Sequence, residues 1–224
     1  MDASQLPKTP LVDPTILLRL RMKAARIDRR FSMNPEPLPD ETIMPCLSTE
    51  LAGGPKFAQV RMAVGADALF FQVDVQGKKH LPWCRESRME DSDGLHVWIN
   101  TRHSPEIQRA NKYCQRFGFF PLGKGRKADM PFASWGLIPR ASEDAPTVAD
   151  DRFAIRARLV DGRYRVVASL HIDALHGLDL RDFPTLGLYY AVIDRELGWQ
   201  ALMASDEYPV HEIPGMWAQW DLST

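Results

Sequence analysis

The segment from Gly94 to Arg102 carries four side chains of the kinds that bind polar ligands: His96, Trp98, Asn100 and Arg102. They alternate with apolar residues, which are Leu95, Val97 and Ile99. Successive side chains of a strand point to opposite sides, so the segment predicts a strand with two unlike faces. One face suits a core. The other presents an imidazole, an indole, an amide and a guanidinium.

Tryptophans elsewhere in the chain extend this candidate ligand face. Flat sugar faces stack on exposed indoles, and an indole is costly to expose without a partner. The alternative to a ligand-binding role is a structural one, in which each tryptophan fills the core or packs inside a loop. The candidate ligand-binding residues are His96, Trp98, Asn100, Arg102, Arg116, Trp83, Trp199 and His211.

No pattern for reaction chemistry is visible in the sequence. There is no Gly-x-Ser-x-Gly nucleophile elbow, and no spacing brings together an acid and a base. The run Gly123–Lys127 is rich in glycine and lysine, but it lacks the spacing of a phosphate-binding loop. We therefore expect a noncatalytic protein, with a basic turn at this run.

Metal-binding patterns are weak. The soft or borderline ligands His80, Cys84, His96, His103 and Cys114 match no compact zinc spacing. The segment Asp91–Gly94 resembles part of a calcium loop, but the EF-hand pattern would put its first ligand on Met89 and its last on Asn100. We expect a turn capped by aspartate side chains and no cofactor, with calcium near Asp91 and Asp93 as the weaker alternative.

The charge balance argues against nucleic acid and acidic membranes as partners. Lys and Arg number 28 against 29 Asp and Glu, which gives a net charge of −1. A basic run extends from Arg19 to Arg30, but no aromatic residues interleave with it to stack bases. We interpret it as the solvated face of an edge strand, where positive charge discourages aggregation.

The sequence carries no secretory signal pattern at its N-terminus and no apolar run long enough to span a bilayer. Its three cysteines, Cys46, Cys84 and Cys114, are too few for a disulfide framework in 224 residues. These features predict free thiols and a cytoplasmic protein, provided that no leader segment has been removed.

Apolar alternation predicts an all-β fold. The expected strands cover 16–23, 57–64, 68–75, 94–101, 116–120, 152–160, 163–172 and 186–194. Asp161–Gly162 is a strong hairpin signal between two of them. We expect a proline-rich wrap up to about residue 55, a short helix over 104–113 capped by Ser104, and a long loop over 124–151. The architecture is then a two-sheet antiparallel β-sandwich with one or two short helices.

The order of the motifs resembles a known family. Six segments resemble, in their order and spacing, those of family 9 carbohydrate-binding modules and the wider DOMON-like β-sandwiches. They are Val60–Met62, Ala68–Val75, Asp93–Asn100, Asp161–Leu170, Leu186–Asp194 and Pro214–Leu222. The resemblance covers roughly residues 55–222. The chain is also similar to a group of bacterial proteins built on this one domain, whose match begins at the first strand. We therefore expect an N-terminal extension over 1–15 and one domain over 16–224.

The resemblance implies a jelly-roll-like sandwich and, in sugar-binding members, two tryptophans that clamp a terminal sugar. This sequence departs from that pattern at three positions. Glu90 and His211 stand where the clamp tryptophans are expected, and His96 replaces a ligand-binding acid. Trp83 or Trp199 could substitute in space.

Two functions follow. The first is a noncatalytic domain that binds a carbohydrate or another small polar ligand. The second is a protein-interaction or scaffold domain of the same fold that has lost the sugar site.

Overall fold

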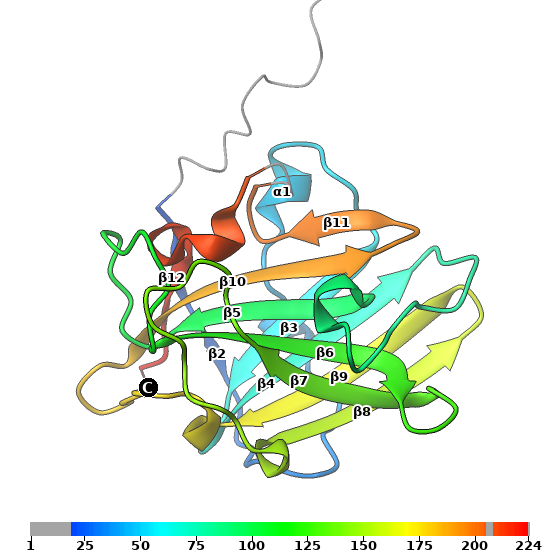
Figure 1. Ribbon diagram of the computed structural model, residues 1–224, viewed down its shortest axis with the longest axis horizontal. Helices are drawn as coiled ribbons and strands as arrows, with labels where there is room; N and C mark the ends of the chain where they lie inside the picture. The colour runs from blue at the N-terminus through cyan, green and yellow to red at the C-terminus, as the bar shows by residue number, and fades with distance from the viewer. Residues whose placement is uncertain (1–18, 205–207, 224) are drawn as a thin grey trace, which may run out of the picture.

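The alternating apolar residues form strands that lie in two packed sheets (Figure 1). The computed structural model describes residues 19–204 and 208–223. Sheet A has the order β1 (Arg21–Lys23), β12 (Ala218–Asp221), β10 (Thr185–Asp194), β5 (Gly94–Asn100), β6 (Cys114–Lys124) and β7 (Met130–Gly136), with β11 (Gly198–Ala201) paired to β10. Sheet B has the order β2 (Ala25–Arg26), β3 (Ala58–Val64), β4 (Ala68–Gln76), β9 (Arg163–His171) and β8 (Phe153–Val160).

Helix is confined to short turns in the described residues. They are α1 (Leu47–Glu50) and the 3-10 helices η3 (Asp40–Thr42), η4 (Met89–Asp91), η5 (Asp150–Arg152), η6 (Ile172–Ala174), η7 (Val210–Glu212) and η8 (Pro214–Met216). The β-sandwich prediction is therefore confirmed. None of these helices has the length and apolar character needed to cross a lipid bilayer.

The core lies between the two sheets, where one side of each strand is apolar. Val97 of β5 and Phe117 of β6 pair in register, and neither is exposed to solvent. Across the sandwich, Phe71 of β4 stacks on Phe119 of β6 with ring centroids 5.4 Å apart. Burial of these side chains from both sheets supplies the main hydrophobic stabilisation of the fold.

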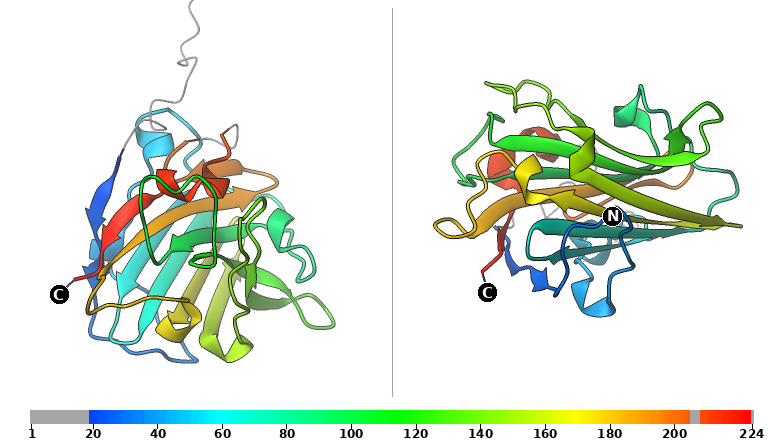
Figure 2. Two further views of the ribbon diagram at one scale, coloured as in Figure 1. Left: turned by 60° about the vertical axis from the view of Figure 1, so that its left-hand side comes forward. Right: turned by 90° about the horizontal axis from the view of Figure 1, so that it is seen from below.

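The edge strands make the sheets mixed rather than purely antiparallel. β1 runs parallel to β12, and β2 runs parallel to β3, while the other pairs are antiparallel. Ala24 lies between β1 and β2, so one short segment leaves sheet A and enters sheet B (Figure 2). The exposed Arg21, Lys23 and Arg26 confirm that the basic run lies on edge strands. The part of the predicted strand 16–23 before residue 19 lies outside the described residues.

The proline-rich wrap follows the edge of sheet B. Met44 N–H donates to the carbonyl of Val60 at 2.9 Å, and Leu38 N–H donates to Oε1 of Gln72 at 2.8 Å. Backbone groups of β3 that would otherwise lie at an open edge therefore have partners. The single turn α1 follows Pro45, where the wrap has turned toward β11.

The predicted helix over 104–113 is wrong. Ser104 does accept the Glu106 N–H, at 3.3 Å, but only one turn forms there. The carbonyl of Ile107 accepts the N–H of Gly215 and the carbonyl of Ala110 accepts the N–H of Ser142. These long-range bonds use the carbonyls that a helix would need for its own ladder.

The predicted loop over 124–151 is wrong in its first part. Residues Met130–Gly136 form β7, which pairs with β6 despite containing Pro131. Proline is tolerated here because β7 is the edge strand of sheet A. The Gly123–Lys127 run forms the turn of this β6–β7 hairpin, closed by the bond from Gly123 N–H to the Ala128 carbonyl, so it is a turn as predicted.

The predicted hairpin at Asp161–Gly162 is confirmed. Val160 pairs with Arg163 across a two-residue turn, and Gly162 has a φ of +72°, which suits glycine. All three cysteines are free thiols in the structure, and burial raises the pKa of Cys84 to about 12 and that of Cys114 to about 11.

Candidate functional site

The outer face of sheet A carries most of the predicted ligand residues. In register, Trp98 of β5 lies between Tyr189 of β10 and Arg116 of β6, and His96 lies between Ala191 and Gly118. Side chains of residues that pair in register point to the same side, so these groups share one face. The alternation in the sequence therefore assigns the face of His96, Trp98 and Asn100 correctly.

This face is covered, which the sequence analysis did not expect. His96 and Asn100 are not exposed to solvent at all, and Trp98 is only 1% exposed. The ring of His211, from η7, lies 5.7 Å from that of Trp98, and Met89 of η4 packs against the position of Gly118. The expected open indole platform at Trp98 is wrong because η4 and η7 fold over it. Replacing Trp98 by alanine would leave a large cavity and lower the free energy of unfolding by about 3–5 kcal/mol.

His96 and Arg116 hold each other in one arrangement. Nε2 of His96 lies 3.0 Å from the Ser92 carbonyl, which can only accept, so Nε2 carries the proton. Nδ1 therefore accepts from a guanidinium nitrogen of Arg116 at 3.2 Å. Burial, and then the charge of Arg116, lowers the pKa of His96 to about 3. The imidazole is neutral at physiological pH.

Arg116 interacts both with the buried Trp98 and with charged residues at the margin of this face. Its guanidinium lies 5.1 Å from the centre of the Trp98 ring, within cation–π range. Burial lowers the pKa of Arg116, while the charges of Glu90 and Asp91 act in the opposite direction. The pKa of His211 is also lowered, mainly by burial, with Glu212 opposing and Arg116 adding to the effect. Glu90 and His211, the two clamp positions of the resemblance, therefore both lie within electrostatic reach of Arg116.

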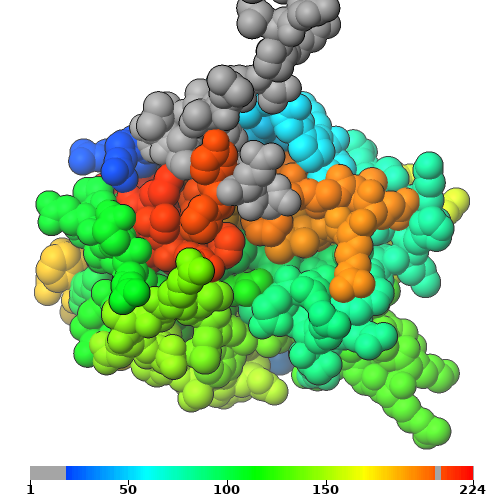
Figure 3. Space-filling model, turned by 45° about the horizontal axis from the view of Figure 1, so that its top comes forward, coloured from blue at the N-terminus to red at the C-terminus, as the bar shows by residue number. Residues whose placement is uncertain are grey.

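Trp199 of β11 stands beside His211, with ring centroids 6.2 Å apart. It is partly exposed, and so is His211, whose side chain is 28% exposed. Of the two tryptophans named as substitutes for a clamp residue, Trp199 is the one that lies beside His211. Figure 3 shows the side of the molecule where β11 and the segment of η7 and η8 meet at the surface.

Four of the eleven buried side-chain atoms that lack a hydrogen-bond partner in the described residues lie in this cluster. Within the described residues, no hydrogen-bond partner is present for Nε1 of Trp98, Nε1 of Trp199, Nε of Arg116 or Nδ1 of His211. Most buried polar groups in folded proteins are paired, so four in one contiguous group require an explanation. They are the features of this face that favour a polar ligand. We call Trp98, Arg116, Trp199 and His211 the ring cluster.

The other four candidates are not part of the ring cluster. His96 is held by Ser92 and Arg116. Asn100 is buried nearby, and its side-chain oxygen accepts the N–H of Arg102. Arg102 turns away and stacks on Phe183, 4.5 Å from the ring centre, beside a separate hollow lined by residues 172–181. Trp83 lies beneath Arg195, whose guanidinium is 3.4 Å from its ring centre. A strand pattern could not reveal these separations because they depend on loop paths.

The turn at Asp93 is built around an ammonium group. Nζ of Lys78 lies 3.1 Å from Oδ2 of Asp93, 2.8 Å from Oδ1 of Asp194 and 3.5 Å from Oε2 of Glu196. Asp93 also accepts the N–H groups of Trp83 and Arg195, as expected for a capping aspartate. Asp91 pairs with Arg88 and Arg195. In the described residues no group of three or more His, Cys, Asp or Glu side chains is arranged to hold a metal ion.

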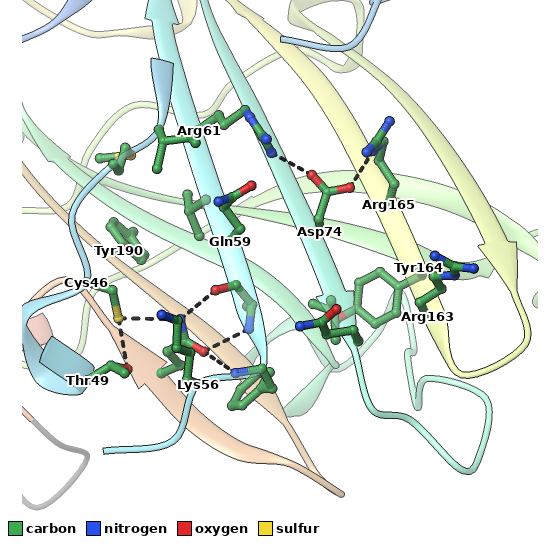
Figure 4. A pocket seen from close by; sticks show the side chains of 18 of the residues that line it. Cys46, Thr49, Lys56, Gln59, Arg61, Asp74, Arg163, Tyr164, Arg165 and Tyr190 are labelled. Carbon is green, nitrogen blue, oxygen red and sulfur yellow. Dashed lines mark hydrogen bonds and ion pairs between the residues drawn. The ribbon is translucent and has the colours of Figure 1, made fainter. Parts of the chain in front are cut away.

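A second hollow, of about 680 Å³, lies on sheet B, and the sequence analysis missed it. Figure 4 shows Arg61, Asp74 and Arg165 in a row across β3, β4 and β9, with Arg163 and Lys56 nearby. The signal was present in the sequence, since Arg156 and Arg158 alternate before the Asp161–Gly162 turn and Arg163 and Arg165 alternate after it.

Comparisons with known proteins identify the fold. A family 9 carbohydrate-binding module from Caldicellulosiruptor kristjanssonii, solved with cellotriose, superposes with a TM-score of 0.56 at 12% identity, over 91% of this chain and 93% of that chain. This chain has the fold of a family 9 carbohydrate-binding module. A family 9 module from the same organism, solved with glucose, superposes with a TM-score of 0.57 at 12% identity, over 91% of this chain and 95% of that chain.

A third structure with this fold is a candidate carbohydrate-binding protein from Bacteroides uniformis. It superposes with a TM-score of 0.55 at 9% identity, over 90% of this chain and 98% of that chain. No protein-family model matches the sequence. No curated protein matches it either. The family 9 fold is thus recognised through structure, at sequence identities that leave the ligand open.

Proposed function

We propose that this chain is a noncatalytic carbohydrate-binding domain and that the ring cluster is its sugar site. The family 9 fold supports the proposal, because the modules that share it were solved with glucose and with cellotriose. The location is supported by His211, which stands at one of the clamp positions of the resemblance and lies beside the rings of Trp98 and Trp199.

The observation that carries the proposal is the set of unpaired buried nitrogens. Trp98, Trp199 and Arg116 each offer an N–H donor, and His211 offers a ring nitrogen. Sugar hydroxyls accept and donate hydrogen bonds, so a sugar ring that displaces η7 from Trp98 can satisfy groups that are costly to leave unpaired. The partly exposed Trp199 supplies an apolar surface for the flat face of the sugar.

The test is calorimetric titration with neutral sugars, starting with glucose and cellotriose. We expect the wild-type protein to bind a member of the panel and Trp199→Ala to bind it at least fivefold more weakly. Loss of the stacking surface is worth on the order of 1 kcal/mol, which corresponds to that factor. Trp199 suits the test because it is partly exposed, and thermal unfolding checks that the variant folds, since the indole also packs against the core.

Trp83→Ala is the matched control. Trp83 is also partly exposed, but it stacks under Arg195 and lies outside the ring cluster. Its replacement should leave sugar affinity within twofold of wild type. A wild-type protein that binds no neutral sugar would overturn the function and favour an interaction domain. Equal affinity of Trp199→Ala and wild type would overturn the site.

A further inference from the structure

The outer face of sheet B carries guanidinium groups from three of its strands, β3, β9 and β8. Arg61 comes from β3, Arg163 and Arg165 from β9, and Arg156 and Arg158 from β8. All except Arg61 are exposed. They share one face because the alternate residues of these strands, such as Val60, Val73 and Val166, are buried in the core.

The positive charge on this face is only partly neutralised. Asp74 pairs with both Arg61, at 2.7 Å, and Arg165. Arg158 lies directly opposite Arg165 in the β8–β9 register, and like charges in that position repel. Within the described residues, no acidic partner is present for Arg156, Arg158, Arg163 or Lys56. The face therefore holds exposed cations that have no carboxylate partner among the described residues.

These cations border a cavity of suitable size. The hollow of about 680 Å³ is lined by Lys56, Arg61, Arg158, Arg163 and Arg165, with Glu50 and Asp74 as the acidic residues. Ligand cavities typically measure about 300–1,000 Å³. The wrap, from Ile43 to Glu50, also contributes to its lining, and Figure 4 shows the basic side chains around it. Amide groups of Gln59 and Gln76 line the same hollow.

We propose that this cavity is a second ligand site and that it takes an acidic oligosaccharide, a sugar chain bearing carboxylates. Arg158, Arg163 and Lys56 would pair with the carboxylates, and Gln59 and Gln76 would bond to hydroxyls. Guanidinium groups suit carboxylates because their planar donors match two oxygens at once. Asp74, held between Arg61 and Arg165, is an example of such a carboxylate on this face.

A sugar is favoured over a nucleic acid by the absence of stacking groups. On the described strands of this face, the residues beside the arginines are Gln59, Gln72, Gln76, Asp74, Val160 and Val167. None is aromatic. The cavity lining does include Phe57, Tyr164 and Tyr190, but all three are buried and present no open ring face, whereas single-stranded nucleic acids are bound by stacking bases on accessible aromatic rings. The site is separate from the ring cluster, which lies on the outer face of sheet A.

The experiment titrates the full chain with an oligogalacturonate and with its methyl ester, which has the same backbone without the charge. We expect the acid form to bind and the ester to bind at least tenfold more weakly. Added salt should weaken binding, because exposed charges are screened. The variant Arg158→Ser/Arg163→Ser should lose about tenfold in affinity. Both residues are exposed, and thermal unfolding confirms that the variant folds.

A control of equal charge change is available in the β6–β7 turn. Arg126→Ser/Lys127→Ser also removes two exposed cations, outside the cavity, and should change affinity less than twofold. Equal losses in the two double variants would overturn the site, and so would equal binding of acid and ester. Inorganic polyphosphate that binds as tightly as the uronate would overturn the assignment to a sugar. Trp199→Ala should leave uronate binding unchanged, which separates this result from the proposed function.

Discussion

At the scale of single residues, His96 is the side chain whose protonation matters most to stability. Its pKa is about 3 in the folded protein, lowered by burial and by Arg116, against about 6.5 in an unfolded chain. The folded state therefore binds fewer protons than the unfolded state between these values. The stabilising contribution of the neutral ring is complete above pH 6.5 and is lost as the pH falls toward 3.

We expect the free energy of unfolding to fall by about 2 kcal/mol between pH 7 and pH 5 through His96 alone. Urea unfolding at the two pH values measures this loss. His96→Gln keeps a donor for Ser92 and an acceptor for Arg116 but cannot titrate, so it should show a smaller loss. His103 and His211 also have lowered pKa values and will leave a residual slope. A variant with the full wild-type slope would contradict this account.

Trp98 illustrates what a strand pattern can and cannot tell at this scale. Alternation correctly assigned its indole to the face opposite Leu95, Val97 and Ile99. Exposure of that face depends on η4 and η7, which come from before β5 and from near the end of the chain. No local pattern encodes where such distant segments fold. The polar face was therefore predicted and its cover was not.

At the scale of elements, Lys78 ties the loop after β4 to the start of β5 and the end of β10. Its ammonium is 5% exposed, and the carboxylates of Asp93 and Asp194 are buried beside it. Burial alone would lower the pKa of Lys78, but hydrogen bonds and charges of Asp194 and Asp93 outweigh it, so the pKa is raised. One buried group of charges therefore joins the loop after β4, the start of β5 and the end of β10.

We expect Lys78→Met to destabilise the protein by about 3–5 kcal/mol, because it leaves two buried carboxylates without their cation. Lys79→Met, at the exposed neighbouring position, should change stability by less than about 0.5 kcal/mol. Chemical denaturation of both variants at pH 7 makes the comparison. Similar stability of the two variants would show that the ion group does not hold these elements together.

Prediction of the elements from sequence succeeded where a segment carries its own pattern. The alternation in β4 and β10 and the turn at Asp161–Gly162 are local, and all were recovered. β7 was missed because Pro131 and Gly136 mask a strand that exists through its pairing with β6. The helix expected over 104–113 does not form, although its local pattern favours one. The N–H groups of the distant residues Gly215 and Ser142 bond to the carbonyls that the helix would need.

At the scale of the whole molecule, the two proposed sites lie on opposite outer faces of one sandwich. The ring cluster lies over the outer face of sheet A, and the arginine-lined cavity lies on sheet B and extends to Tyr190 and Gln200 of β10 and β11. They share no residue. Substitutions in one should therefore leave affinity at the other unchanged, because changes at distant positions without common partners act independently.

The parallel pairing of β1 with β12 sets a limit on how the chain can fold during synthesis. Arg21 of β1 pairs in register with Gln219 of β12, and Arg26 of β2 donates to the carbonyl of Leu222, 196 residues later in the sequence. Sheet A cannot be completed until β12 has left the ribosome, so its first strand must wait unpaired while nearly all the rest is made. We expect ribosome-bound chains that still hold β12 in the exit tunnel to be cut readily by protease within β1. Chains released past residue 222 should resist. Protection of β1 before β12 emerges would mean that this edge closes without its partner.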